Sequence, residues 1–164
     1  MFPIRKILHP TDFSEQSTAA FEVACALARD YSAELVVLHV YSNAPVYAPD
    51  GIAVPIPTED PYRVRVQLYN LQPSDPRVKV KHIMVEGNPI DQILKNARTE
   101  AVDLIVMGTH GTSGLARMLM GSVAESVTRK TLCPVLTLRK PFHPHVENAM
   151  PDIHPAAEPA VAAR

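Results

Sequence analysis

Hydrophobic residues follow two alternating patterns along this chain. Short apolar runs typical of buried β-strands fall at residues 4–9, 35–40, 78–85, 104–107 and 134–138. Between several of these runs, apolar positions recur every three or four residues, as on one face of an α-helix, at about 14–31, 88–97 and 122–130. The alternation predicts an α/β protein with an open, five-stranded parallel sheet and helices on both of its faces.

Local signals mark the end of the first strand and the start of the first helix. Pro10 has no N–H to donate to a sheet ladder, so we expect the first strand to end there. Asp12 together with Glu15, or Ser14 alone, can cap the helix that follows. The sequence leaves these two capping arrangements open.

Two later helices also have start signals. Asn88 is a favourable cap residue, and Pro89 suits the first helical position because its fixed φ is already helical. Ser122 and Glu125 have the spacing of a capping box, which predicts that Ser122 caps the last helix.

The segment between the second and third strands is rich in proline. Residues 42–61 contain five prolines and predict a long surface loop without regular structure, either a binding element or a simple insertion. Residues 58–61 then resemble a helix start, with Val64, Leu68 and Leu71 at helical spacing. Residues 64–68 also alternate with period two, so a strand there is the alternative.

Composition limits the kinds of partner. With 164 residues and a formal net charge of -1, the chain suits one globular domain without long-range attraction to nucleic acid. No targeting segment is recognisable and no apolar run is long enough to cross a membrane, so we expect a cytoplasmic protein that binds neither nucleic acid nor membrane. Cys25 and Cys133 lack metal-ligand spacing and are expected to be core residues.

The chain divides into a domain at 1–140 and a tail at 141–164. The tail contains mainly proline, histidine, alanine and acidic residues with few large apolar side chains, and we expect it to be mobile. His143, His145 and His154 share no helix or strand face that would arrange them around a metal.

Glycine is concentrated in one segment, 108–122, which holds four of the chain's six glycines. The segment follows an apolar strand and leads into a helix, whose N-terminus presents unpaired N–H groups and a partial positive charge. A glycine-rich loop of this kind predicts an anion site, most often for phosphate, whereas the alternative is a mobile connection.

The first strand should meet this loop. In an open parallel sheet, ligands bind beyond the carboxyl ends of the strands that flank the topological switch point, so residues 10–12 could lie beside the glycine loop. Asp12 is then either a partner for ribose hydroxyls or a helix cap, and one side chain can do both.

The loop matches neither G-x-G-x-x-G, the dinucleotide-binding motif, nor G-x-x-x-x-G-K-[ST], the P-loop motif. The sequence therefore argues against both of the enzyme classes that carry these motifs. It does match G-x2-G-x9-G-[ST], through Gly108, Gly111, Gly121 and Ser122. In this motif the chain resembles the universal stress protein family, and residues 9–14, 38–40 and 133–136 extend the resemblance. The similarity covers about residues 3–140 and is weakest at 42–72.

The resemblance implies a Rossmann-like fold of the adenine nucleotide alpha hydrolase type, with strand order 3-2-1-4-5. It also implies ATP with Mg²⁺ as ligands, because this signature marks the ATP-binding members of the family. Adenine would lie near Pro10 and the backbone of Val40, ribose near Asp12 and Gly108, and phosphates along the glycine loop, with Asp12 also the candidate carboxylate for Mg²⁺. The nucleotide-binding residues so implied are Pro10, Thr11, Asp12, Val40, Met107, Gly108, Thr109, His110, Gly111, Thr112, Ser113, Gly114, Gly121, Ser122 and Val123.

Three functions remain open at this stage. The first is a nucleotide-dependent regulatory module in stress response, and the second is a slow ATPase or nucleotidyl-transfer enzyme on the same fold. His110 is the candidate base for catalysis, but a loop histidine beside phosphates is more often a contact or a spacer. Arg117 could pair with phosphate or point to solvent, and the sequence does not decide between them. The third is a dimeric interaction protein with a vestigial site.

The fifth strand, 134–138, is the expected dimer contact. In the strand order implied by the resemblance it lies at a sheet edge, where a second copy could pair with it. The alternative is that the tail covers this edge.

Overall fold

The computed structural model describes residues 3–47, 53–57, 59–109 and 120–139. The tail at 141–164 and the central part of the glycine segment lie outside these residues. The described elements, in chain order, are β1 (Lys6–Thr11), α1 (Glu15–Tyr31), β2 (Glu34–Tyr41), β3 (Asn43–Tyr47), β4 (Ala53–Pro57), α2 (Pro61–Asn70), β5 (Val80–Glu86), α3 (Pro89–Thr99), β6 (Leu104–Gly108), α4 (Ser122–Lys130) and β7 (Val135–Leu138).

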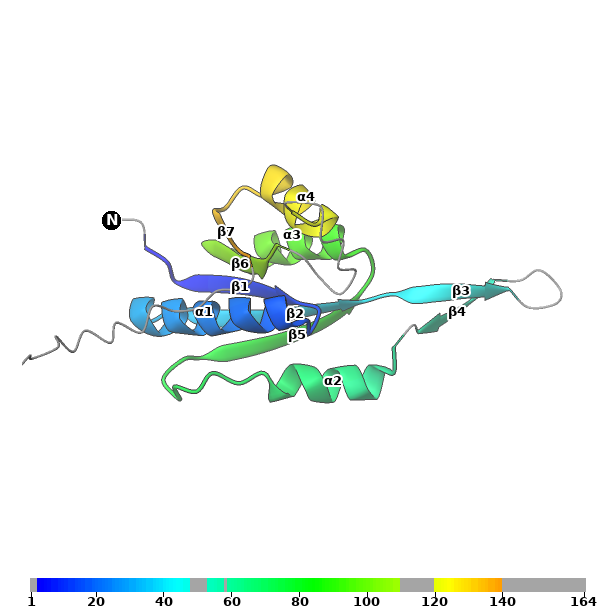
Figure 1. The fold of residues 1–164 in the computed structure, drawn as a ribbon, viewed down its shortest axis with the longest axis horizontal. Helices are drawn as coiled ribbons and strands as arrows, with labels where there is room; N and C mark the ends of the chain where they lie inside the picture. Colours follow the sequence, from blue (N-terminus) through cyan, green and yellow to red (C-terminus); the bar gives the residue numbers. More distant parts are fainter. Residues whose placement is uncertain (1–2, 48–52, 58, 110–119, 140–164) are drawn as a thin grey trace, which may run out of the picture.

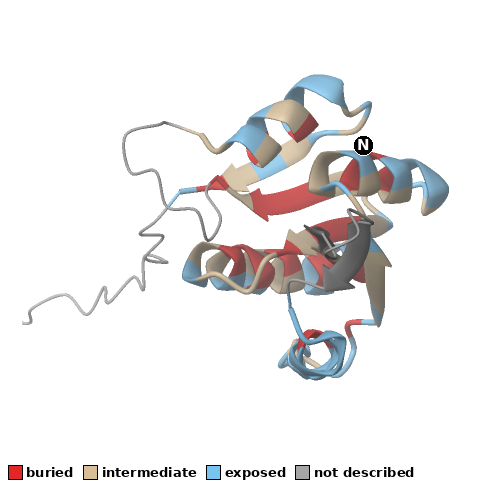
Figure 2. Ribbon diagram, turned by 90° about the vertical axis from the view of Figure 1, so that its right-hand side faces the viewer, coloured by how far each residue is buried: buried red, intermediate tan, exposed pale blue. Residues whose placement is uncertain are grey.

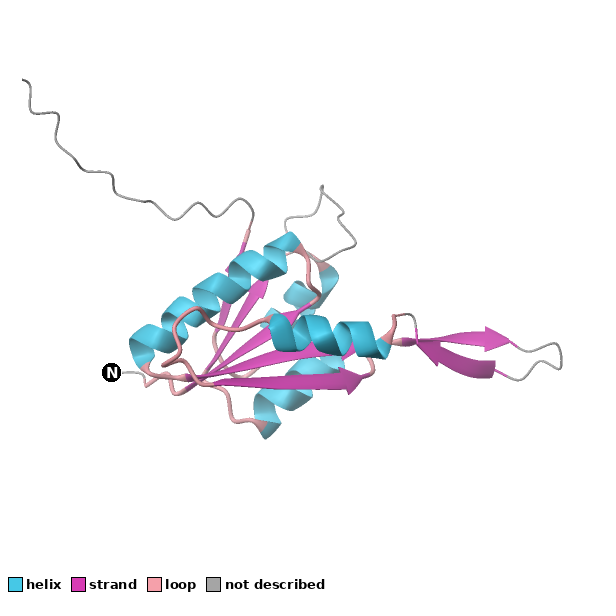
Figure 3. Ribbon diagram, turned by 90° about the horizontal axis from the view of Figure 1, so that it is seen from below, coloured by secondary structure: helices cyan, strands magenta, loops and turns pink. Residues whose placement is uncertain are grey.

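Five of the strands form one parallel sheet, shown in magenta in Figure 3. Its order is β5-β2-β1-β6-β7, and every neighbouring pair in it is parallel. Counted along the sheet, this is the order 3-2-1-4-5, so the predicted fold class is confirmed. Because all five strands run the same way, their carboxyl ends meet at one edge of the sheet.

Helices cover both faces of the sheet (Figure 1). On one face, Ile7, Leu35 and Val37 pack with residues of α1 and α2, and on the other Leu8 and Val36 pack with residues of α3 and α4. Successive strand residues point to opposite faces, so burial on both sides explains the unbroken apolar runs. Figure 2 shows this as buried residues concentrated in the central strands and on the helix sides that face them. No described helix is long and apolar enough to cross a membrane.

The prediction that the first strand ends at Pro10 is wrong, because β1 continues to Thr11. The N–H and C=O groups of every second residue in a strand point to the same neighbouring strand. The Lys6 carbonyl points to the β6 side, where it accepts a hydrogen bond from Asp103 N. The Pro10 nitrogen therefore also faces β6, but pairing of β1 with β6 ends at Leu8. Proline is tolerated there because no partner strand needs its N–H.

The helix caps differ in part from the predictions. Ser14 alone caps α1, accepting a bond from Ser17 N, so the arrangement with Asp12 and Glu15 as the cap is wrong. Ser122 is not the cap of α4, because Gly121 occupies that position and Ser122 is the first residue inside the helix.

The capping of α3 by Asn88, followed by Pro89, is confirmed, with Asn88 Oδ1 accepting a bond from Ile90 N. The helix predicted after residue 60 is also confirmed, and the alternative of a strand at 64–68 is wrong. Asp60 caps this helix, α2, with Pro61 as its first residue.

The expected loop at 42–61 is instead largely an antiparallel hairpin of β3 and β4. The hairpin projects away from the sheet beyond the end of β2 (Figures 1 and 3). Pro45 pairs with Pro55 and Asn43 with Pro57, so the three prolines occupy alternate positions of the ladder. The nitrogen atoms of all three prolines, which carry no hydrogen, can then point away from the partner strand. No hydrogen bond of the ladder is lost, and a proline-rich segment can form a hairpin.

Candidate functional site

A pocket of about 250 Å³ opens at the carboxyl ends of β1 and β6. From β1 the chain builds the sheet toward β5, and from β6 it builds toward β7, so the pocket lies at the topological switch point. Since pairing of β1 with β6 ends at Leu8 and Ile105, the two strands leave a gap beyond this register, and the pocket lies there.

The pocket brings together every predicted site residue that the structure describes. These residues are Pro10, Thr11, Asp12, Val40, Met107, Gly108, Thr109, Gly121, Ser122 and Val123. The remaining predicted residues lie outside the described part of the chain, and they are His110, Gly111, Thr112, Ser113 and Gly114.

The sequence did not identify five further lining residues, which are Ser17, Leu38, Pro89, Ile93 and Ala124. They come from α1, β2, α3 and α4 and were assigned to helix faces, a helix start or the strand core. Their spacing is the same as that of ordinary core and cap positions, so no local signal separated them from those positions. Only the packing of the helices onto the sheet places them at the pocket.

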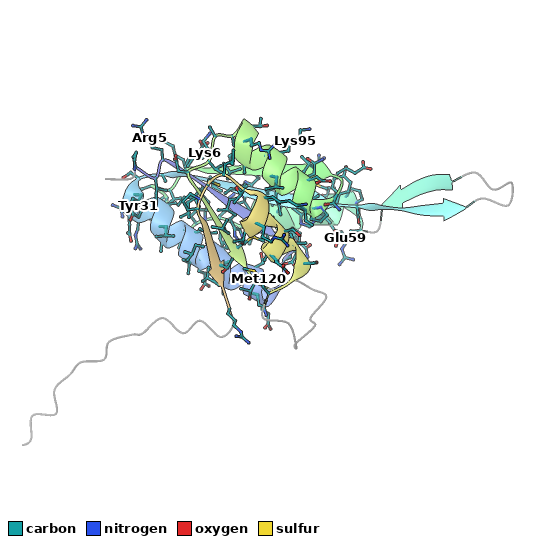
Figure 4. All side chains as sticks on the ribbon, turned by 90° about the horizontal axis from the view of Figure 1, so that it is seen from above. Arg5, Lys6, Tyr31, Glu59, Lys95 and Met120 are labelled. Carbon is teal, nitrogen blue, oxygen red and sulfur yellow. The ribbon has the colours of Figure 1, made fainter. Side chains whose placement is uncertain are left out.

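Main-chain bonds hold both ends of the glycine segment at the pocket. Thr109 N donates to the Leu138 carbonyl at 2.9 Å, which ties the end of β6 to β7. Gly121 N donates to the Thr109 carbonyl at 2.6 Å, so the two ends of the glycine segment lie side by side. Met120 marks this return beside the start of α4 (Figure 4).

The N-terminus of α4 differs from those of the other described helices. Side chains of Ser14, Asp60 and Asn88 accept bonds from the first turns of α1, α2 and α3, whereas Gly121 has no side chain and makes no such bond for α4. The first N–H groups of α4 are therefore not capped by the residue at the cap position, and Ser122, Val123 and Ala124 line the pocket. Such a helix start can bind an anion through its N–H groups and its dipole.

Asp12 is the only charged side chain among the described residues that line the pocket. Its Oδ1 accepts bonds from Ser14 N at 3.1 Å and Ser14 Oγ at 2.7 Å. Asp12 therefore orients the residue that caps α1, while it lies at the pocket wall itself. Asp12 is therefore not the cap of α1 but supports the residue that is, and contact of Asp12 with a ribose stays a prediction.

A buried polar network lies beneath this wall. Ser17 Oγ donates to Thr11 Oγ1 at 2.8 Å and lies 3.5 Å from His9 Nε2. His9 Nδ1 lies 2.9 Å from the Val106 carbonyl, which can only accept, so Nδ1 carries the proton. Burial lowers the pKa of His9 to about 4, although the Val106 bond and the charge of Asp12 act in the opposite direction. His9 is thus a neutral, fully buried residue near neutral pH.

A second buried histidine connects the end of β1 to the start of α2. His39 Nδ1 lies 2.9 Å from the Thr11 carbonyl, and the ring stacks on Phe13 with centroids 4.6 Å apart. His39 Nε2 lies 3.4 Å from Glu59 Oε2. Glu59 stands just before α2, at the end of the sheet from which the hairpin projects (Figure 4).

The lining of the pocket combines apolar and polar regions. Leu38, Ile93 and Met107 supply apolar surface from the core, and Asp12 faces the same space as the start of α4. Among the described residues there is no group of three or more His, Cys, Asp or Glu side chains that could hold a metal ion. The arrangement suits a ligand with an apolar part, hydroxyl groups and an anionic end.

Comparison with known proteins agrees with this description. The sequence profile of the universal stress protein family matches residues 3–139. The chain is 34% identical over 148 residues to universal stress protein MJ0531 of Methanocaldococcus jannaschii. The aligned region covers 84% of this chain and 83% of that protein.

Solved structures show the same architecture. The structure of MJ0577, also from Methanocaldococcus jannaschii, is 28% identical with a TM-score of 0.67 and covers 86% of this chain and 99% of that one. A universal stress protein solved in complex with cAMP is 23% identical with a TM-score of 0.60, covering 84% and 98% of the two chains. At that identity the similarity to the cAMP complex shows the fold alone.

Proposed function

This chain belongs to the universal stress protein family, and on that premise we propose that it binds ATP with Mg²⁺ in the pocket at the switch point and acts as a nucleotide-dependent regulatory module. The observation that carries the proposal is the start of α4, which has no side-chain cap and lines the same pocket as Asp12. One end of the pocket can thus accept phosphate, and Asp12 can accept hydrogen bonds from ribose hydroxyls.

We assign the parts of the nucleotide as follows. Adenine lies at the apolar end near Pro10 and the backbone of Val40, and ribose lies between Asp12 and Gly108. The phosphates lie along residues 111–114 and at the start of α4. The solved complex of a related fold with cAMP makes an adenine nucleotide the first ligand to test.

The conformation of Gly121 supports the position of the phosphates. Its φ is -71°, which any residue can adopt, so the backbone itself does not require glycine. Glycine is also a favoured residue at a helix cap, and close approach of another group to the main chain is a second reason for a residue without a Cβ. Phosphate at the first turn of α4 would make such an approach.

Regulation is favoured over catalysis by the charges at the site. Among the described lining residues Asp12 is the only acid, and metal-assisted phosphoryl transfer requires groups that hold the metal and also position the nucleophile. A hydrogen bond joins His39 to the Thr11 carbonyl at the pocket, and the buried His39 Nε2, which has no hydrogen-bond partner among the described residues, lies 3.4 Å from Glu59 just before α2, so occupancy could alter the surface along this route.

Calorimetry with Mg²⁺ and ATP tests the proposal. Gly121→Val should weaken binding at least tenfold, because a branched side chain would occupy the space assigned to phosphate, while Gly121→Ala should have a smaller effect. Circular dichroism would establish that both variants are folded. Unchanged ATP affinity in folded Gly121→Val would show that phosphate does not bind at this helix.

A second variant separates ribose from phosphate. Asp12→Ala should weaken ATP more than inorganic triphosphate, since only ATP offers hydroxyl groups to the carboxylate. Equal losses for the two ligands would assign Asp12 to the metal or to support of the α1 cap. Because Asp12 holds Ser14, the melting temperature of the variant must be measured alongside.

We also propose a homodimer formed through β7, which lies at one edge of the sheet. Leu136 is 38% exposed on this strand, whereas Leu138 packs in the core beneath α1. Leu136→Lys is therefore the clean test, because a lysine at 138 would damage the fold as well. Light scattering should give a dimer for the native chain and a monomer for Leu136→Lys, and a monomeric native chain at micromolar concentration would refute the dimer.

A further inference from the structure

Helix α2 has two apolar sides, and only one of them is buried. Val64 and Leu68 are the only buried residues in the helix, and Leu68 packs in the core with Leu35 and Val37 of the sheet. Tyr62, Val66 and Tyr69 are 76%, 44% and 54% exposed. Their spacing of four and then three residues places them in one stripe, largely on the side opposite to Val64 and Leu68, with Tyr69 at its border where the ring also contacts His82 of β5. In Figure 2, α2 is seen nearly end-on as a mainly exposed helix at the rim of the molecule.

Such a stripe is absent from the other described helices. The remaining exposed large hydrophobic residues of the described chain are Tyr31, Leu132 and Leu136. Tyr31 is a single residue at the end of α1, Leu132 lies in the loop before β7, and Leu136 lies on β7 itself. Isolated apolar residues on a surface need no explanation, but a contiguous row of aromatic and aliphatic side chains is typical of an interaction site.

The stripe is bordered by positive charge. Arg63 and Arg65 lie on its two sides at helical spacing, and neither forms an ion pair with any described residue. The helix contains no acidic residue; Glu59 and the cap residue Asp60 stand just before it, and neither forms an ion pair with Arg63 or Arg65. Its outer side is therefore a basic surface with an apolar centre, and tyrosine and arginine are the residues that contribute most at protein interfaces.

The helix is also weakly supported by the rest of the fold. Ten residues are too few for a helix to be stable alone in water. Only two of its side chains are buried, and the Asp60 cap and the contact of Tyr69 with His82, with ring centroids 5.1 Å apart, add to them. Covering the outer side would bury three more large apolar side chains and order the helix further.

We propose that the outer side of α2 is a docking surface for an acidic amphipathic helix of a partner protein. The surface is formed by Tyr62, Arg63, Arg65, Val66 and Tyr69. The apolar residues of the partner would pack along the stripe, and its carboxylates would pair with the two arginines, which form no ion pair with a described residue. The proposal concerns a different surface from the pocket and holds whether or not ATP binds there.

Charge selects this partner over two others. A second copy of α2 would bring arginines against arginines, which repel each other. Single-stranded nucleic acid could stack on the tyrosines, but the chain has a formal net charge of -1, and a nucleic-acid surface normally requires a larger basic area.

Two matched peptides test the proposal against the full-length chain labelled with ¹⁵N. The first is a synthetic amphipathic helix with leucine on one side and glutamate on the other, and the second replaces every glutamate with lysine. The glutamate peptide should shift the amide resonances of α2 with saturation below millimolar concentration, while the lysine peptide should not. A double variant, Arg63→Glu with Arg65→Glu, should weaken binding at least tenfold.

A control variant uses the same charge change elsewhere. Lys95 and Arg98 are exposed on α3, on the other side of the sheet, so Lys95→Glu with Arg98→Glu should leave the affinity unchanged. Four outcomes would overturn the proposal: no shift of α2 resonances at 1 mM glutamate peptide, equal shifts with both peptides, equal losses in the two double variants, or shifts of α2 with oligouridylate but not with the glutamate peptide. Concentration-dependent shifts of α2 without peptide would instead assign the surface to self-association.

Discussion

The buried imidazole of His9 should make the stability of the protein depend on pH in a defined window. His9 is fully buried, and burial lowers its pKa from 6.5 to about 4 in the folded protein. In the unfolded chain the ring is hydrated and binds a proton below about pH 6.5. Between these two values the unfolded state binds more protons than the folded state, so the free energy of unfolding must fall as the pH is lowered.

The size of the effect follows from the same two values. A difference of about 2.5 pH units, at roughly 1.36 kcal/mol per unit, corresponds to a loss of about 3 kcal/mol once the pH is below 4. Between pH 7.5 and 5.0 the expected loss from His9 alone is about 2 kcal/mol, because most of the window has then been crossed. At about pH 7.5 and above, where the unfolded ring is also neutral, the contribution of His9 is fully present, and the stability should not change further because of it.

Urea unfolding at pH 7.5 and 5.0, followed by circular dichroism, measures this loss in the native chain and in His9→Gln. Glutamine can still donate to the Val106 carbonyl but does not titrate, so the variant should lose about 2 kcal/mol less between the two pH values. Other histidines and the carboxylates contribute to both chains and cancel in this comparison. Equal losses in the two chains would mean that His9 is not held neutral by burial, and the reasoning would be refuted.

Two further predictions concern single side chains. Asn88→Ala should lower the free energy of unfolding by about 1 kcal/mol, because Asn88 Oδ1 accepts bonds from the first turn of α3; urea unfolding measures this, and a change below a few tenths would contradict it. Burial, with a smaller effect of Glu22, raises the pKa of the Cys25 thiol to about 11, so at pH 8 Cys25 should react with iodoacetamide on the order of a hundredfold more slowly than free cysteine. Mass spectrometry of timed samples checks this, and modification of Cys25 at the free rate would show that its thiol is not shielded.

The sequence determined the architecture of the sheet because its strands are apolar without interruption. Runs such as residues 35–38 avoid water on both sides, and in a chain that alternates strands with helices this is satisfied by a parallel sheet covered on two faces. Caps such as Asn88 were also readable, since a cap bonds to residues two or three positions away. The glycine spacing also located the candidate site, because a loop between a strand and a helix is formed by residues that are close in sequence.

Tertiary structure decided what depends on neighbours distant in sequence. Pro10 remains within β1 because β6 has already separated from it, and the prolines of the β3–β4 hairpin fit because they share alternate positions of one ladder. Ser17 and Ile93 reach the pocket only through the packing of their helices on the sheet. A local pattern reports which side chains avoid water, but pairing register and helix packing determine which of them meet. The same distinction explains α2, where the described fold leaves Tyr62, Val66 and Tyr69 largely exposed, although Tyr69 also contacts His82 of β5.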